Sequence, residues 1–172
     1  MKKLLTILAL MFFTMCTPNA QAGQVQPWSI SIIEVYVQRG PYSSQMTSAM
    51  RNWVKTLNGK LLVNILSSKT ALKMSHIEFV FDQNLQEGVI ESGHKKANRP
   101  YVRININTAN IEKDVLQAKF SHYAGIALGL DESQNQNSVL FKTPAKNQKM
   151  LDEDIISLKK LYGVKIKKKS IR

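Results

Sequence analysis

The sequence predicts a single α/β domain built around a mixed β-sheet. Its 172 residues suit one domain. Apolar residues make up 44% and charged residues 21%, which is ordinary for a globular protein and excludes a disordered chain, a disulfide scaffold and a collagen-like fibre. Along the chain, segments typical of a strand, a helix, three strands and two helices follow one another, and this order favours helices packed on a sheet.

The first predicted strand and helix occupy residues 28–57. Residues 28–37 alternate between polar and apolar side chains and are rich in β-branched and aromatic residues, so they predict a strand that breaks at Gly40-Pro41. Residues 43–57 predict an amphipathic helix that ends at Asn58-Gly59. Its apolar residues recur at intervals of three and four: Met46, Met50, Trp53, Val54 and Leu57.

Three further strands are predicted, over residues 61–66, 76–81 and 101–106, because each is short and rich in β-branched or aromatic residues. Between the last two, residues 82–100 are polar and contain Gly88 and Gly93, which predicts a long loop.

Two helices are predicted in the C-terminal part. The first spans about 111–128, with its N-terminal cap at Thr108-Ala109-Asn110 and its end at Gly129. Residues 131–145 then form a polar loop around the apolar residues 139–141. Three acidic residues suit the first turn of the last helix, which closes at Tyr162-Gly163. These residues are Asp152, Glu153 and Asp154.

Residues 1–22 have the pattern of a secretory signal peptide. Lys2 and Lys3 precede an apolar run, and Ala20-Gln21-Ala22 offers small residues for cleavage after Ala22. The run is too short for a stable membrane anchor, and no later stretch is long and apolar enough to cross a membrane. We therefore expect export to the periplasm or the medium. A lipoprotein with lipidated Cys16 is the alternative, although residues 13–15 do not suit it.

The mature chain, residues 23–172, has no cysteine and a net charge of +10, since two lysines are lost from the full chain's +12. Such a surface favours anionic partners. Residues 165–172 form a basic tail that could bind an anionic envelope surface or simply be a solvated terminus. Nucleic acid is a less expected partner, because the tail lacks aromatic residues for stacking and the protein is predicted to be exported.

Residues 121–141, SHYAGIALGLDESQNQNSVLF, resemble the zinc helix and following turn of the matrixins, a branch of the metzincin metallopeptidases. The family pattern is H-E-x-G-H-x-L-G-L-x-H-S, followed by S-V-M-Y. The order of the other segments is also similar, from a strand and a proline–tyrosine turn to a last helix ending leucine–tyrosine–glycine. The resemblance thus implies a metzincin-like domain over residues 23–164: a mixed, twisted sheet packed with an N-terminal helix, a zinc-helix equivalent and a C-terminal helix.

The resemblance assigns His122 to the first zinc-ligand position and Glu132 to the third. Ile126 takes the second position and cannot bind a metal, while Tyr123 takes the position of the general-base glutamate. Catalysis in this family needs three ligands, an open coordination position for water, and that base. A phenol, with its reference pKa near 10, cannot replace a carboxylate base at neutral pH. No zinc is therefore expected unless other ligands restore the site.

Because Ile126 lies one turn away, we favour a partly buried helix histidine over a zinc ligand for His122, and a solvated loop acid beside Asp131 for Glu132. Two other histidines, His76 and His94, could act as replacement ligands. We therefore expect a catalytically inactive pseudopeptidase that binds an extended peptide or protein along an edge strand, either residues 101–106 or a neighbour. The alternatives are an active zinc metalloendopeptidase with unusual ligands and a cationic envelope-binding protein.

Overall fold

The computed structural model describes residues 25–84, 86–95, 99–109 and 112–166. The predicted signal peptide, 1–22, lies outside these ranges, as does most of the basic tail, 167–172. Within the described ranges, no helix combines the length and apolar character needed to cross a membrane.

A five-stranded sheet forms one layer of the molecule, with strand order β2-β1-β3-β5-β4. Neighbouring strands are parallel except β4, which pairs antiparallel with β5 at one edge. The strands are β1 (Ile32–Val37), β2 (Leu62–Leu66), β3 (Ile77–Asp82), β4 (Gly88–Lys95) and β5 (Arg99–Asn107). The predicted mixed sheet is confirmed.

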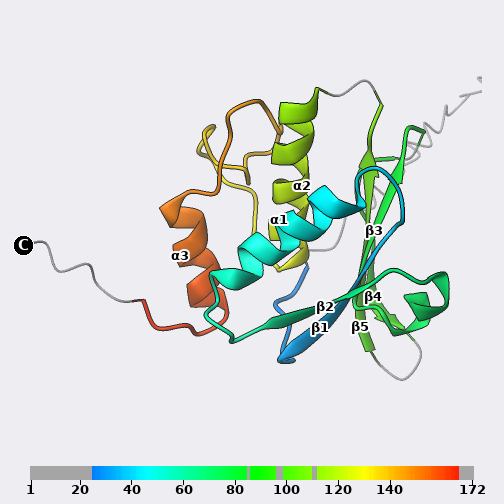
Figure 1. Ribbon diagram of the computed structural model, residues 1–172. Helices are drawn as coiled ribbons and strands as arrows, with labels where there is room; N and C mark the ends of the chain where they lie inside the picture. Colours follow the sequence, from blue (N-terminus) through cyan, green and yellow to red (C-terminus); the bar gives the residue numbers. More distant parts are fainter. Residues whose placement is uncertain (1–24, 85, 96–98, 110–111, 167–172) are drawn as a thin grey trace, which may run out of the picture.

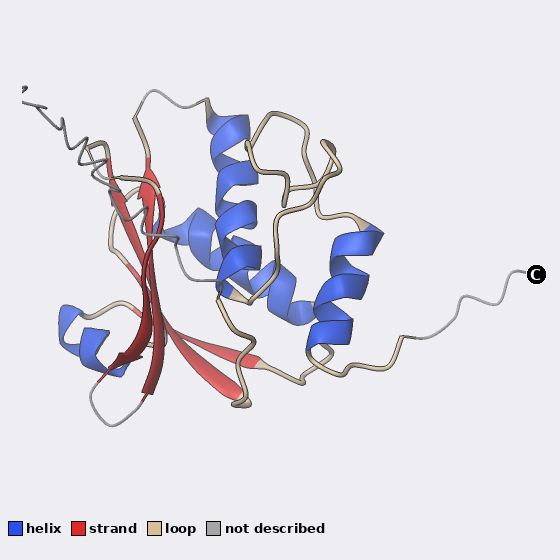
Figure 2. Ribbon diagram, turned by 180° about the vertical axis from the view of Figure 1, so that it is seen from behind, coloured by secondary structure: helices blue, strands red, loops and turns tan. Residues whose placement is uncertain are grey.

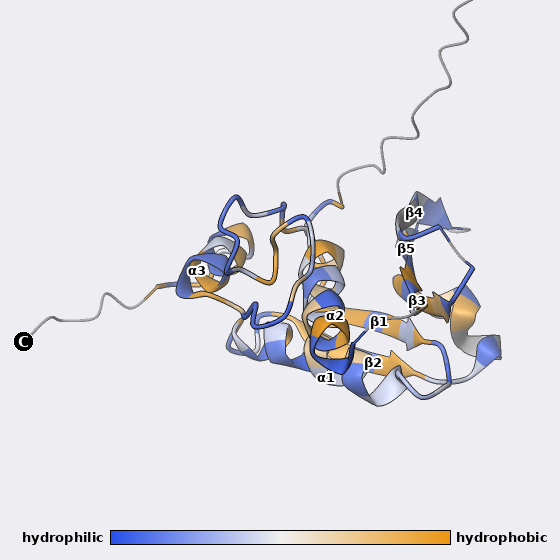
Figure 3. Cartoon of the chain, turned by 90° about the horizontal axis from the view of Figure 1, so that it is seen from above, coloured by the Kyte–Doolittle hydropathy of each residue, from blue (hydrophilic) through white to orange (hydrophobic). Residues whose placement is uncertain are grey.

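Three α-helices lie on one side of this sheet, and a short 3-10 helix lies on the other (Figures 1 and 2). The α-helices are α1 (Ser43–Lys55), α2 (Lys113–Ala127) and α3 (Asp152–Leu161), and the 3-10 helix is η1 (Lys69–Met74). Along α1 and α3 the ribbon changes between hydrophilic and hydrophobic residues, as expected for helices with one buried face (Figure 3). The arrangement agrees with the predicted N-terminal, central and C-terminal helices.

The core lies between the sheet and the helices, and Trp53 of α1 is fully buried within it. The Trp53 Nε1–H group donates a hydrogen bond of 2.8 Å to the Ser121 carbonyl of α2. Gly125 of α2 lies against the same indole: a Cβ there would come 3.1 Å from Trp53 Cζ2 and 2.6 Å from Leu140 Cδ2. Gly125 therefore permits close packing of α2 against α1 and Leu140.

Residues 25–31 correct the expected strand start at residue 28. Val25 and Trp28 are buried, and β1 begins only at Ile32. The Trp28 Nε1–H group donates to the Ala127 carbonyl at 2.8 Å, at the end of α2. Gly129, with a φ of +89°, brings its backbone so close that an added Cβ would lie 3.1 Å from Pro27 N. Burial of the indole ring fixes this segment on α2.

Tyr162 also holds this N-terminal segment. Its hydroxyl donates to the Leu128 carbonyl at 3.0 Å and accepts a bond of 3.3 Å from the Trp28 backbone N–H. Burial raises the pKa of Tyr162 to about 12, so the hydroxyl keeps its proton and continues to donate at neutral pH. The C-terminal end of α3 is thereby tied to the C-terminal end of α2.

Two further expectations are wrong in part. The predicted loop 82–100 contains β4, because residues 88–95 pair with β5 despite their glycines and polar side chains. The N-terminal cap of α2 is Glu112, with no side-chain capping bond, rather than the predicted Thr108-Ala109-Asn110. Asn110 itself lies outside the described residues.

Candidate functional site

His122 lies on α2 and is almost fully buried, with 4% of its surface exposed. Its Nδ1 lies 3.0 Å from the Val139 carbonyl oxygen. Because a carbonyl only accepts, Nδ1 must carry the proton and donate. Burial lowers the pKa of His122, which favours the neutral ring. The lone pair of the neutral ring is then on Nε2. The hydrogen bond from Nδ1 orients the ring, and Nε2 can act as an acceptor or as a metal ligand.

The Val139 carbonyl is positioned by a buried polar network in the turn that follows α2. The Ser138 hydroxyl contacts both Asp154 carboxylate oxygens, at 2.9 and 2.8 Å, and accepts a 2.9 Å bond from the Leu140 N–H. Asp154, in the first turn of α3, also accepts from the Leu151 N–H at 2.8 Å. The predicted role of an acid at this helix start is confirmed, and the same carboxylate fixes the turn that orients His122.

Tyr123 occupies the position that the resemblance gives to the general base. Its ring packs edge-on against the His122 ring, with 4.9 Å between the two centroids. Burial is the main cause that raises its pKa, and a hydrogen bond and charge interaction with Glu87 raise it further. Tyr123 therefore remains a neutral phenol that donates to Glu87, and it cannot accept a proton from water as a carboxylate base would.

Glu87 was not singled out by the sequence, yet it lies at the centre of this site. One of its carboxylate oxygens, Oε1, forms a 2.7 Å ion pair with Lys119 Nζ. Lys119 is one turn before Tyr123 on α2 and also contacts the Asn107 carbonyl at 3.2 Å. In the sequence, the only indication that Lys119 is buried is that its neighbours in the helical segment are apolar. No sequence pattern predicts its pairing with Glu87.

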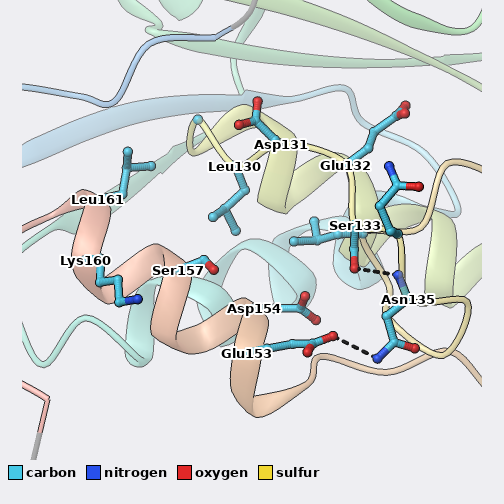
Figure 4. Close-up of a pocket in the computed structure, with 13 residues that line it drawn as sticks. Leu130, Asp131, Glu132, Ser133, Asn135, Glu153, Asp154, Ser157, Lys160 and Leu161 are labelled. Atoms are coloured by element: carbon cyan, nitrogen blue, oxygen red, sulfur yellow. Dashed lines mark hydrogen bonds between the residues drawn. The ribbon is translucent and has the colours of Figure 1, made fainter.

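Glu132 lies apart from these buried contacts. It is exposed in the segment after α2 and lines a pocket of about 850 Å³ between that segment and α3. Figure 4 shows Asp131 and Glu132 on one side of this pocket and Glu153 and Asp154 on the α3 side. The negative charge of Glu132 acts to raise the pKa of His122, against the larger effect of burial.

The donor set does not fit the three-ligand zinc site of the resemblance. Ile126, at the second ligand position, is partly buried against the hydrophobic core and offers no donor atom. Over residues 25–84, 86–95, 99–109 and 112–166, no group of three or more histidine, cysteine or acidic side chains is placed to hold a metal ion. His122 and Glu132 are thus the two candidate donors of an incomplete set.

The proposed replacement ligands lie elsewhere in the fold. His76, next to the start of β3, is buried, and its Nδ1 accepts a 3.0 Å bond from the Glu34 N–H. Its ring also packs edge-on against Trp28 at 5.8 Å. His94 is exposed and lies on β4, not in the loop that the sequence predicted. His76 therefore has a structural role in joining β1 to β3.

This role of His76 predicts a loss of stability in acid. Burial lowers its pKa, with nearby Arg99 as the next cause; Lys95 acts in the same direction and Glu34 opposes both. Because the unfolded chain then binds the proton more readily, the contribution is present above about pH 6.5 and is lost as the pH falls below it. The urea midpoint should drop between pH 7.5 and pH 5, and His76→Asn should reduce that drop. His94→Asn, which removes a surface histidine, is the control; equal drops in all three proteins would contradict the role of His76.

Comparisons with known proteins identify the fold. No family model and no curated protein matches the sequence. Two solved structures of myroilysin match at TM-scores of 0.54 and 0.53, with 13% and 14% identity. They cover 82% and 80% of this chain, and 97% and 86% of the myroilysin chains. High choriolytic enzyme 1, a hatching enzyme zinc-protease from Oryzias latipes, matches at a TM-score of 0.44 and 12% identity, over 84% of this chain and 97% of the other. The chain has a metzincin-like fold.

Proposed function

We propose that this chain is an exported, catalytically inactive relative of the metzincin peptidases that binds an extended peptide or protein segment. The chemistry of α2 is the observation that carries the proposal. Ile126 cannot bind a metal, and Tyr123 is a buried phenol tied to Glu87. A hydrolytic zinc centre needs three ligands and a base, and α2 supplies only His122 toward that set.

The sheet supports the peptide-binding part of the proposal. Strand 101–106, which we expected at an edge, lies within β5 and pairs on both sides, whereas its neighbour β4 is the last strand of the order. An edge strand has a row of backbone N–H and C=O groups available to an added strand. A peptide paired with β4 would extend the sheet beyond this edge, and Glu87 lies directly before the first residue of β4.

Metal analysis and a proteolysis assay test the proposal directly. Purified residues 23–172 should contain no stoichiometric zinc, cleave no casein, and keep the same melting temperature when EDTA is added. A structural or catalytic zinc would instead contribute to folding, so its removal would lower the melting temperature. Zinc at one equivalent with EDTA-sensitive cleavage would contradict the proposal and favour an active peptidase with unusual ligands.

A cationic envelope-binding role is a second candidate, favoured by the charge of the chain. We propose that residues 1–22 are removed and that 165–172 form a basic tail outside the domain of residues 23–164. The Val164 N–H donates to the Lys159 carbonyl at 2.8 Å after the end of α3, and Lys165 and Ile166 are exposed. This placement supports a tail that adds little to the core.

Truncation at residue 164 should therefore weaken binding to anionic vesicles without unfolding the domain. It takes the net charge of the mature chain from +10 to +5. Each basic residue at an anionic surface contributes about 1 kcal/mol, and the contribution falls with salt because screening shortens the range of the charges. Sedimentation with phosphatidylserine vesicles over a salt series measures the effect, with neutral vesicles as the control. Equal binding of both proteins at low salt would contradict a role for the tail.

A further inference from the structure

The Glu87 carboxylate is held by two donors from one helix. Lys119 Nζ lies 2.7 Å from Glu87 Oε1, and the Tyr123 side chain forms a hydrogen bond with the same residue. Lys119 and Tyr123 are four residues apart on α2, so their side chains lie one above the other on one face of the helix. An ammonium and a phenol in this arrangement form a binding site for a carboxylate.

The two sides of this contact differ in how firmly they are held. The Lys119 side chain is only 10% exposed, belongs to a long helix and is fixed further by the Asn107 carbonyl. The Glu87 side chain is 33% exposed and comes from an irregular segment just before β4. Gly88, directly after it, has a φ of +118°, a conformation that other residues rarely adopt. The donors are thus preorganised, and the acceptor lies on a surface segment.

A buried ammonium must keep a carboxylate partner, because an unpaired charge in this environment is strongly destabilising. A carboxylate from this chain or from a bound molecule can pair with the Lys119 ammonium equally well. Glu87 immediately precedes the β4 edge, so a peptide paired with β4 would bring its own side chains close to Lys119 and Tyr123.

We propose that Lys119 and Tyr123 form a carboxylate-binding site that Glu87 occupies within the chain, and that an acidic side chain of a bound peptide displaces Glu87. The peptide part rests on the proposed function. A carboxylate-binding site at this position implies that the ligand is an extended peptide with an acidic side chain, in keeping with the positive charge of the chain. Glu87 then acts as an internal competitor that weakens the binding of peptides without an acidic residue at this position.

Chemical rescue tests the carboxylate site without any peptide. Glu87→Ala should lower the melting temperature, and 100 mM sodium propionate should recover about 2–4 °C of it, since a ligand stabilises the state that it binds. Propionamide with matching sodium chloride should recover nothing. The matched variant Glu91→Ala removes an exposed acid from β4 and should not respond to propionate. Adding Lys119→Met to Glu87→Ala should abolish the rescue.

Rescue that is absent, or that survives Lys119→Met, would overturn the proposal. A second arm uses Glu87→Gln and also serves if Glu87→Ala does not fold, because the amide still accepts from Lys119 without the negative charge. This arm measures fluorescence anisotropy with a labelled Ala-Val-Glu-Val-Ala peptide and its glutamine counterpart. Glu87→Gln should bind the glutamate peptide about tenfold more tightly than the parent does, with no gain for the glutamine peptide.

The two arms separate failure of the site from failure of the proposed function. Equal binding of both peptides by the parent and Glu87→Gln would overturn the carboxylate site and leave peptide binding intact. Propionate rescue with no binding of either peptide would support the carboxylate site and contradict strand addition at β4.

Discussion

Replacing Trp53 with alanine should lower the free energy of unfolding by about 3–5 kcal/mol, the usual range for deletion of a buried aromatic side chain. The indole is fully buried between α1 and α2, and its loss would leave a cavity beside Gly125. The Ser121 carbonyl would also lose its 2.8 Å hydrogen bond from Nε1. Urea denaturation followed by circular dichroism measures the change.

Trp53→Phe and Arg51→Ala are the controls for this result. Phenylalanine keeps most of the apolar volume but not the N–H donor, so its cost should be smaller than that of alanine. Arg51 is exposed on the same helix, and its loss should change stability by less than about 0.5 kcal/mol. If Trp53→Ala costs no more than Arg51→Ala, α1 does not pack on α2 as described.

The paired change Tyr123→Glu with Ile126→His should create a zinc site, with affinity at least about 100-fold above that of the parent. Position 126 lies one turn after His122, so both rings would project from one face of α2. The Val139 carbonyl already orients the His122 ring with Nε2 available. Removing Ile126 from the core should cost about 1–3 kcal/mol of stability.

Competition with a fluorescent zinc chelator measures the affinity of this variant. The matched control is the same variant with His122→Asn, which keeps the new glutamate and histidine and removes one donor. Zinc binding that is unchanged from the parent in a folded variant would show that His122 and position 126 do not converge as the resemblance implies.

The helices were predictable because their signals are local. The recurring apolar residues of 43–57 and the acidic start and glycine end of the last helix each depend on a few neighbouring positions, and both helices form close to the predicted bounds. β4 was missed because its stability comes from pairing with β5, while Gly88 and Gly93 locally favour a turn. Trp28 looked like a strand residue because its contact with Ala127 lies far along the chain.

The site was only partly predictable for the same reason. The sequence motif identified His122, Tyr123 and Ile126, since they lie on one helix at fixed spacing. It could not reveal Glu87 or the burial of Lys119, which depend on where the segment before β4 meets α2. Long-range pairs of single charged residues leave no periodic pattern in a sequence.

The hydrogen bond between Trp28 and Tyr162, separated by 134 positions, has a consequence for the order in which the protein can assemble. A ribosome makes residues 25–28 well before Tyr162, so this segment must wait until the end of α3 has been made before both hydrogen-bond partners exist. Closing so long a loop is slow, and contacts of this kind are expected late in folding. Until then, the indole of Trp28 and the end of α2 remain exposed on the newly made chain, where chaperones and proteases can reach them.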